Sequence, residues 1–153
     1  MKEIKSTKII NINSKSLSEI KKLNLKNLGL NKIQEPNIFE YNSNVFRVLK
    51  YKIKSKILFK IFFKDNNIHI ELQSITGLPK FIKKNITLNI KVDIYQEREE
   101  KCRAKRFISL SLNKESFVLK FLSDEIANKL LLNILEALSQ RFDKKFLKKI
   151  FYQ

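Results

Sequence analysis

The sequence contains very little glycine, proline or cysteine, and no tryptophan. Its 153 residues include 2 Gly, 2 Pro and 1 Cys. The single cysteine, Cys102, excludes an intramolecular disulfide and a zinc site built from cysteines. Two glycines are too few for a glycine-rich phosphate-binding loop, so the common nucleotide-binding motifs are excluded. The scarcity of Gly and Pro also excludes collagen-like and linker-rich architectures.

Long apolar runs are missing as well. None reaches the roughly 18 residues of a membrane-spanning helix. The first ten residues contain lysines without a following apolar segment, so we expect no secretory signal there. We find no catalytic motif, and we therefore expect no enzymatic activity, no cofactor, no metal site and no transmembrane segment. The chain is expected to work in the compartment in which it is made.

The sequence is strongly basic. Its formal net charge is +17, from 32 Lys and Arg against 15 Asp and Glu. A field this positive attracts polyanions and acidic surfaces. Lys outnumbers Arg by 27 to 5, although Arg is the residue that binds phosphate in a bidentate manner. Lys is also encoded by A/T-rich codons, so selection for anion binding and genome composition both stay open as explanations.

The length and composition indicate a single domain over residues 1–153, long enough to bury a core. The charged residues 1–8 are expected to be frayed, and Lys8 to Asn13 alternates as a short strand. Ser16 begins a capping-box pattern for a short helix. The segment from Gly29 to Pro36 is expected to be a loop.

Period-two alternation of apolar residues then predicts several strands in close succession. These are Val45 to Ile53, Ile57 to Lys64, Ile68 to Gln73, Ile86 to Tyr95 and Phe107 to Asn113. A tight turn is predicted at Asp65-Asn66-Asn67, because Asp and Asn tolerate left-handed backbone conformations. The charged run from Gln96 to Arg103 is expected to be a solvated turn.

One long amphipathic helix is predicted from Ser123 to Phe151. Ser123 is a favoured N-cap, and acidic residues follow it in the first turn. The apolar stripe consists of Ala127, Leu130, Leu131, Ile134, Leu138 and Phe142, widened by Leu132 and Leu135. The opposite, exposed face is predicted to carry Lys129, Asn133, Glu136, Gln140 and Asp143. The predicted fold class is α+β, with a curved antiparallel sheet packed on one long C-terminal helix.

Four segments resemble an uncharacterised family of cyanobacterial and plastid-encoded proteins, known as a hypothetical chloroplast reading frame and remotely related to START-like, helix-grip domains. They are Phe46-Arg47-Val48, Ile68 to Ser74 followed by Gly77, Ile86 to Tyr95, and Leu131 to Phe142. The resemblance covers about Asn37 to Tyr152. It implies a helix-grip fold, in which a bent sheet wraps round the C-terminal helix, and a location in the chloroplast stroma; without it, the expected location is cytoplasmic. Relatives at superfamily distance bind lipids, pigments and other apolar ligands.

The resemblance and the doubled apolar surface together suggest an apolar ligand, such as a lipid or pigment, between the sheet and the helix. Side chains from both surfaces would face this interior, whether they line a cavity or simply form a core. The candidate ligand-binding residues are Ile70, Leu72, Leu88, Ile90, Leu131, Ile134 and Leu138.

An alternative function is binding to nucleic acid, a ribosome or an anionic membrane surface through a lysine-rich sheet face. Lysines with interleaved aromatics on a sheet face resemble a generic platform for single-stranded nucleic acid. The same lysines also fit an outer face that prevents aggregation. The candidate anion-binding residues are Lys50, Lys52, Lys54, Lys60 and Lys64.

His69 and Cys102 are the remaining candidates for chemistry. His69 is the only histidine, and on the polar side of its strand it is expected to be an ordinary surface residue. Cys102 lies between charged residues that favour a thiolate, but no histidine lies nearby in sequence to act as its base. Neither residue predicts a catalytic or metal site.

Overall fold

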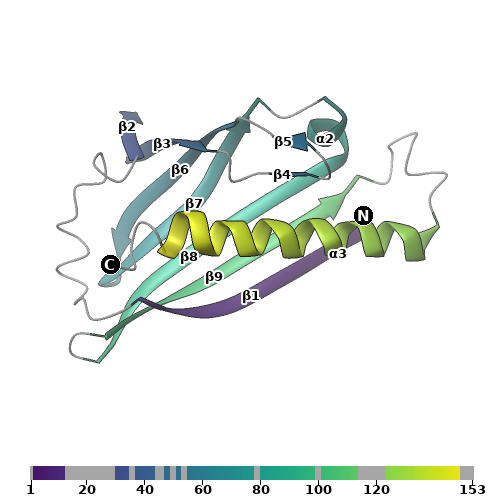
Figure 1. Cartoon of the computed structure of the whole chain (residues 1–153). Helices are drawn as coiled ribbons and strands as arrows, with labels where there is room; N and C mark the ends of the chain where they lie inside the picture. Colours follow the sequence, from purple (N-terminus) through teal and green to yellow (C-terminus); the bar gives the residue numbers. More distant parts are fainter. Residues whose placement is uncertain are drawn as a thin grey trace.

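The computed structural model describes residues 2–12, 30–34, 37–43, 47–48, 51–52, 55–77, 80–98, 101–113 and 123–148. The main element is a seven-stranded sheet in which every neighbouring pair is antiparallel (Figure 1). In spatial order its strands are β1 (Lys2–Ile12), β9 (Lys101–Leu112), β8 (Ile86–Arg98), β7 (Asn67–Thr76), β6 (Ser55–Lys64), β3 (Ile38–Ser43) and β2 (Leu30–Gln34).

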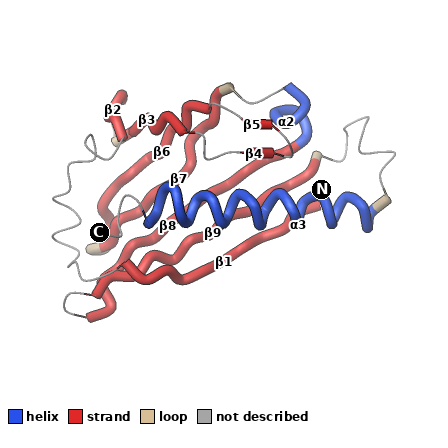
Figure 2. The backbone as a smooth tube through the Cα atoms, in the orientation of Figure 1, coloured by secondary structure: helices blue, strands red, loops and turns tan. Residues whose placement is uncertain are grey.

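A single long helix crosses one face of this curved sheet (Figure 2). It consists of α3 (Asp124–Arg141), which continues as a π-helical segment, η3 (Phe142–Lys148). Ser123 is the N-cap, as predicted, and its hydroxyl accepts a hydrogen bond from the backbone N–H of Ile126 at 3.2 Å. The predicted fold class is therefore confirmed. The prediction of one α-helix as far as Phe151 is wrong in its last part, where the winding changes at Phe142; residues 149–151 lie outside the described residues.

The buried face of the helix matches most of the predicted stripe, and α3 packs on β1 and β9. The predicted residues that are buried are Ala127, Leu131, Ile134, Leu135, Leu138 and Phe142. Leu130 is partly buried, and Leu132 is exposed. Leu132 does not widen the stripe, because its position turns away from the sheet.

The first residues of the chain form a full edge strand instead of a frayed end. β1 pairs with β9 along its whole length, from Lys2 opposite Leu112 to Ile12 opposite Cys102. The prediction of fraying is therefore wrong. Its charged residues gave no local reason for order, but the pairing with β9 satisfies the backbone hydrogen-bonding groups that face this neighbour, and Ile10 and Ile12 are buried.

The segment predicted to be a loop before Pro36 also forms a strand, β2. It pairs with β3, and the side chain of Leu30 is fully buried. Five residues are too short for alternation to be distinctive in the sequence, so the pairing with β3 decides the structure. The short helix predicted after Ser16 lies outside the described residues.

The prediction of one continuous strand from Val45 to Ile53 is wrong. The chain forms a small separate hairpin there, in which β4 (Arg47–Val48) pairs with β5 (Tyr51–Lys52). Because the chain reverses between Val48 and Tyr51, its residues cannot alternate between the two faces of the main sheet.

The next strands follow the predictions more closely. β6 and β7 form a hairpin whose turn residues Asp65 and Asn66 have φ of 54° and 64°, as predicted for a tight turn. The run from Gln96 to Arg103 is not a solvated turn, because β8 extends to Arg98 and β9 begins at Lys101. A short helix, α2 (Lys80–Asn85), lies between β7 and β8 and has no counterpart in the prediction.

Candidate functional site

The inner face of the sheet and the buried face of α3 belong to one continuous apolar core cluster. Alternate side chains of each strand point toward the helix, because successive side chains leave a strand on opposite faces. The structure places all seven predicted lining residues in this interior. Five of them are buried, namely Ile70, Ile90, Leu131, Ile134 and Leu138. Leu72 and Leu88 are partly buried and pack against the same cluster.

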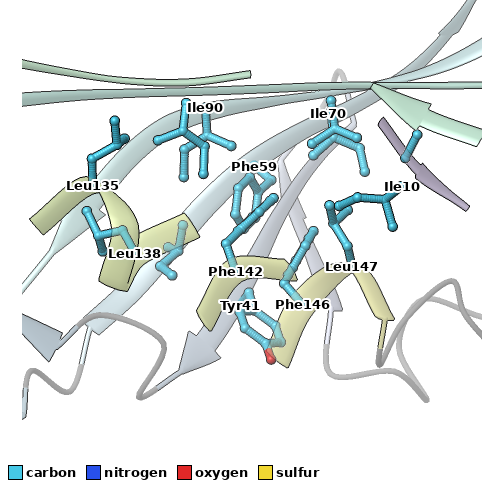
Figure 3. Packing of buried hydrophobic residues seen from close by; sticks show 14 of the residues in the cluster. Ile10, Tyr41, Phe59, Ile70, Ile90, Leu135, Leu138, Phe142, Phe146 and Leu147 are labelled. Atoms are coloured by element: carbon cyan, nitrogen blue, oxygen red, sulfur yellow. The ribbon is translucent and has the colours of Figure 1, made fainter. Parts of the chain in front are cut away.

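Aromatic rings fill the interior beside the end of the helix (Figure 3). Phe59 of β6 packs against Phe142 and Phe146, with ring centroids 6.3 Å and 4.7 Å away. Phe142 and Phe146 stack on each other at 4.9 Å. Tyr41 of β3 meets Phe146 edge-on at 5.2 Å, and its hydroxyl donates to the carbonyl of Lys145 at 3.3 Å. We name Tyr41, Phe59, Phe142 and Phe146 the aromatic cluster; it closes this end of the interior.

β7 and β8 separate along part of their length. They pair only from Ile68 with Ile94 to Glu71 with Lys91, although β7 continues to Thr76 and β8 begins at Ile86. Figure 1 shows the two strands diverging toward α2. We name the inward apolar residues of this stretch the split end; they are Leu72, Ile75, Ile86 and Leu88. All four pack against the core but remain partly exposed.

A charged pair also lies in the interior. Arg106 occupies an inward position of β9, in phase with the buried Ala104 and Ile108. Its side chain is 2% exposed, and its Nε lies 2.8 Å from Oδ1 of Asp143, whose side chain is 9% exposed. These two atoms form an ion pair without a hydrogen bond, because the N–H does not point at the oxygen. Arg106 Nη1 donates to the hydroxyl of Ser6 at 3.1 Å and to its carbonyl at 3.4 Å.

Asp143 corrects the predicted exposed face of the helix, because it is buried. Ser139, one turn earlier on the same side of the helix, is buried as well, and Arg106 provides an interior counter-charge for Asp143. Burial raises the pKa of the Asp143 carboxyl above its usual 3.8, although the positive charges of Arg106, Lys8 and Lys148 act in the opposite direction.

Ser139 lies on the same side of the helix as Asp143, one turn earlier. Its side chain is buried, and within the described residues its Oγ has no hydrogen-bond partner. The sequence-based prediction missed both Ser139 and Arg106. A signal for Arg106 was present, because it interrupts an otherwise apolar inward row of β9 once the strand is extended back to Lys101.

Only three of the five lysines proposed as an anion-binding face belong to the described residues. Lys50 and Lys54 lie outside the described residues, and Lys52 belongs to the separate hairpin. Lys60 and Lys64 lie on the outer face of β6, where Lys60 Nζ is 5.1 Å from the centre of the Phe62 ring. A nucleic-acid platform along one lysine-rich strand is therefore not supported.

His69 and Cys102 are more enclosed than the sequence suggested. The His69 ring stacks on Phe62 at 5.1 Å, and its Nδ1 lies 2.5 Å from Oδ1 of Asp93. Cys102 is fully buried, which removes the exposure that a reactive thiolate requires. The described part of the chain contains no group of three or more His, Cys, Asp or Glu residues suited to a metal ion. Nor does it contain a helix long and apolar enough to cross a membrane.

Comparison with known proteins identifies the fold. No family model and no curated protein matches the sequence. Among solved structures, the Zhui aromatase/cyclase from Streptomyces sp. R1128 is similar with a TM-score of 0.57 and 8% identity, over 98% of this chain and 91% of that one. A conserved protein from Geobacillus kaustophilus has a TM-score of 0.51 and 11% identity, over 95% and 96%. A START superfamily protein from Mycobacterium smegmatis has a TM-score of 0.48 and 9% identity, over 94% of this chain and 97% of that one.

The chain thus has the predicted helix-grip fold, a curved antiparallel sheet packed on one long helix, in common with the Streptomyces and Geobacillus structures. The prediction that the chain is not an enzyme is contradicted, because the similar aromatase/cyclase shows that a protein with this fold can be an enzyme. The lack of a recognisable catalytic motif in the sequence was not sufficient reason to exclude enzymatic activity. Side chains that meet only in three dimensions need not form a motif in the sequence, and identity of 8% assigns no reaction to this chain.

Proposed function

We propose that this chain binds a small apolar molecule in the interior between the sheet and α3. The observation that carries the proposal is the contrast within one continuous apolar cluster. The aromatic cluster closes one end, whereas the split end keeps inward aliphatic side chains partly exposed beside unpaired strand edges. Covering such side chains with an apolar ligand is favourable by about 25 cal/mol for each Å² removed from water.

The composition of the interior supports the same proposal. Small-molecule sites are mostly apolar and contain a few placed polar groups. The described interior has this character, since its lining is aliphatic and aromatic apart from a few polar groups such as Arg106, Ser139 and Asp143. The fold adds support by analogy, because the similar Streptomyces protein is named for a cyclase reaction.

The predicted lining residues would have different roles in this proposal. Leu72 and Leu88, at the split end, would meet the ligand first, because they are still partly exposed. The deeper wall would be formed by the buried residues on the sheet and helix, namely Ile70, Ile90, Leu131, Ile134 and Leu138.

The test is to purify the protein gently from its source and identify co-purifying molecules by native mass spectrometry. A second measurement titrates the purified protein with Nile red, an uncharged apolar dye. We expect Leu88→Gln to weaken dye binding, whereas Thr87→Gln, on the exposed outer face of the same strand, leaves it unchanged. A protein without a co-purifying molecule and without dye binding would overturn the proposal.

The plastid origin and stromal location implied by the sequence resemblance stay part of this proposal. They are supported by the segments that resemble the plastid-encoded family and by the lysine-rich composition typical of A/T-rich genomes. Immunoblotting of fractionated source cells tests the location. Detection outside the plastid fraction would leave the ligand proposal standing and remove the assignment to the stroma.

A further inference from the structure

The charges around Asp143 are unbalanced. Three cations act on this carboxyl, namely Arg106, Lys8 and Lys148. Lys8 pairs with Arg106 across β1 and β9, so both side chains leave the sheet on the helix side. Lys8 and Lys148 are exposed, whereas Arg106 is buried. This part of the interior therefore has a buried cation at its inner limit and two solvated cations nearer the surface.

The hydrogen-bonding capacity of the same region is only partly used. Within the described residues, Arg106 donates through Nη1 to Ser6, whereas its buried Nε, 2.8 Å from Oδ1 of Asp143, makes no hydrogen bond. The Ser139 hydroxyl, one turn from Asp143, is buried without a partner. Buried polar groups are normally satisfied, so the unpartnered Ser139 hydroxyl, one helical turn from the Arg106–Asp143 pair, and the unbonded Nε of Arg106 point to an absent acceptor. We name Lys8, Arg106, Ser139, Asp143 and Lys148 the Arg106 cluster.

We propose that the Arg106 cluster binds the carboxylate of an amphipathic ligand whose apolar chain lies in the interior. This rests on the proposed function, and it specifies the ligand class as long-chain carboxylic acids. A carboxylate accepts hydrogen bonds from a guanidinium and from a hydroxyl at the same time. It also offsets the local excess of positive charge.

A carboxylate fits this cluster better than a phosphate does. Arg106 is buried and only part of its donor set is free, so a dianion would lose much of its hydration without enough donors to replace it. A monoanion loses less, and its flat two-oxygen group matches the planar guanidinium. Asp143 stays as the second partner of Arg106, on the Nε side.

The experiment compares hexadecanoate with 1-hexadecanol, which has the same chain and no charge. Each is used to displace Nile red from the intact protein at neutral pH. We expect the acid to bind at least about tenfold more tightly than the alcohol, because hydrogen bonds that involve a charged group contribute about this much to affinity. Hexadecyl phosphate, which has the same chain, is measured in the same way, and tighter binding of the phosphate than of the acid would overturn the assignment to carboxylates.

Variants then locate the site. Ser139→Ala removes the unpartnered hydroxyl and is expected to cost the acid about tenfold in affinity. Lys8→Gln is expected to cost about two- to fivefold, because Lys8 is exposed. The matched control is Lys105→Gln, which changes the same charge next to Arg106 but lies exposed on the opposite face of β9. Lys105→Gln should leave the affinities for the acid and for the alcohol unchanged. Ser139→Ala and Lys8→Gln should likewise leave the affinity for the alcohol unchanged.

Replacing Arg106 alone would leave Asp143 buried without its counter-charge, so the pair is removed together. Arg106→Met with Asp143→Leu is expected to abolish the preference for the acid while alcohol binding persists. Equal binding of acid and alcohol to the parent protein would overturn the carboxylate proposal and leave the apolar-ligand function intact. Failure of both to displace the dye, or of the dye to bind, would overturn both proposals.

Discussion

The two ends of the sheet–helix interior differ in how they are closed, although both arise from alternating strands. At the aromatic cluster, four rings from β3, β6 and η3 lie in mutual contact, and Phe59, Phe142 and Phe146 are almost fully buried. At the split end, the inward aliphatic residues of β7 and β8 remain partly exposed. The difference does not lie in the alternation. It comes from where neighbouring strands stop pairing and from which side chains the helix brings against them.

This difference suggests a division of roles within one core. Rigid packing of large rings stabilises the aromatic end and holds the end of the helix on the sheet. The split end contributes less to stability because its side chains are less buried, and it is therefore the part in which a ligand can add buried surface. Four substitutions or measurements test this division, and the expected effects decrease from the first to the last.

The largest loss of stability is expected for Ile134→Asp. This residue lies in α3, the helix that packs along the whole interior. Ile134 is buried in the apolar interior, and an unpaired carboxylate there costs several kcal/mol. A domain of this size has only about 5–15 kcal/mol of net stability, so we expect a largely unfolded protein by circular dichroism. Asn133→Asp, one residue away and exposed, should melt like the parent. If both variants melt like the parent, the helix does not hold the two ends together.

Phe142→Ala should cost about 3–5 kcal/mol, because it removes a ring from the aromatic cluster and leaves a cavity. Phe142 contacts both Phe59 and Phe146. Urea denaturation measures the change in the free energy of unfolding. Phe142→Leu keeps most of the volume and should cost clearly less. A loss no larger than that of the split-end variant below would contradict the division between the two ends.

Leu88→Ala at the split end should cost only about 1–2 kcal/mol, because the side chain of Leu88 is partly exposed before the change. The surrounding residues are less tightly enclosed, so a smaller cavity remains. The same urea titration, run beside Phe142→Ala, gives the comparison directly. A cost equal to that of Phe142→Ala would mean that the split end is as tightly closed as the aromatic end.

The smallest effect concerns the pH dependence of stability near the aromatic end. Burial raises the folded-state pKa of Asp143 above its usual 3.8, so the folded state binds this proton more tightly than the unfolded state does. The stabilising contribution is then complete below 3.8 and is lost as the pH rises through the folded-state pKa. We expect the unfolding free energy of the parent, relative to that of Asp143→Asn, to fall over this range in urea titrations. A relative gain with rising pH would show that the ion pair with Arg106 outweighs burial.

The sequence predicted the parts of the fold that depend on local pattern. Ile90, Val92 and Ile94 were placed correctly on one face of a strand, and Ser123 was placed correctly at the start of the helix. The turn at Asp65 and Asn66 was predicted because these residues tolerate positive φ. Of the candidate site, the inward positions of the seven apolar residues could be predicted, since they follow from alternation and from the helical stripe.

The errors occurred where partners distant in the sequence decide the structure. Lys2 to Lys8 carries too much charge to predict a strand, yet pairing with β9 orders it. Asp143 was predicted on the exposed face because it is charged, but it is buried where Arg106 lies opposite as its counter-charge.

The sequence by itself therefore determined the main strands and the long helix, the faces of those strands and most of the apolar stripe of the helix, because periodicity and capping act within a few neighbouring residues. Only the tertiary structure decided which strand covers which edge, where β7 and β8 separate, and which charges meet inside. Those outcomes depend on contacts between residues far apart in the chain, such as Ser6, Arg106 and Asp143, and the free energy of burying them is defined only once the sheet and the helix are packed together.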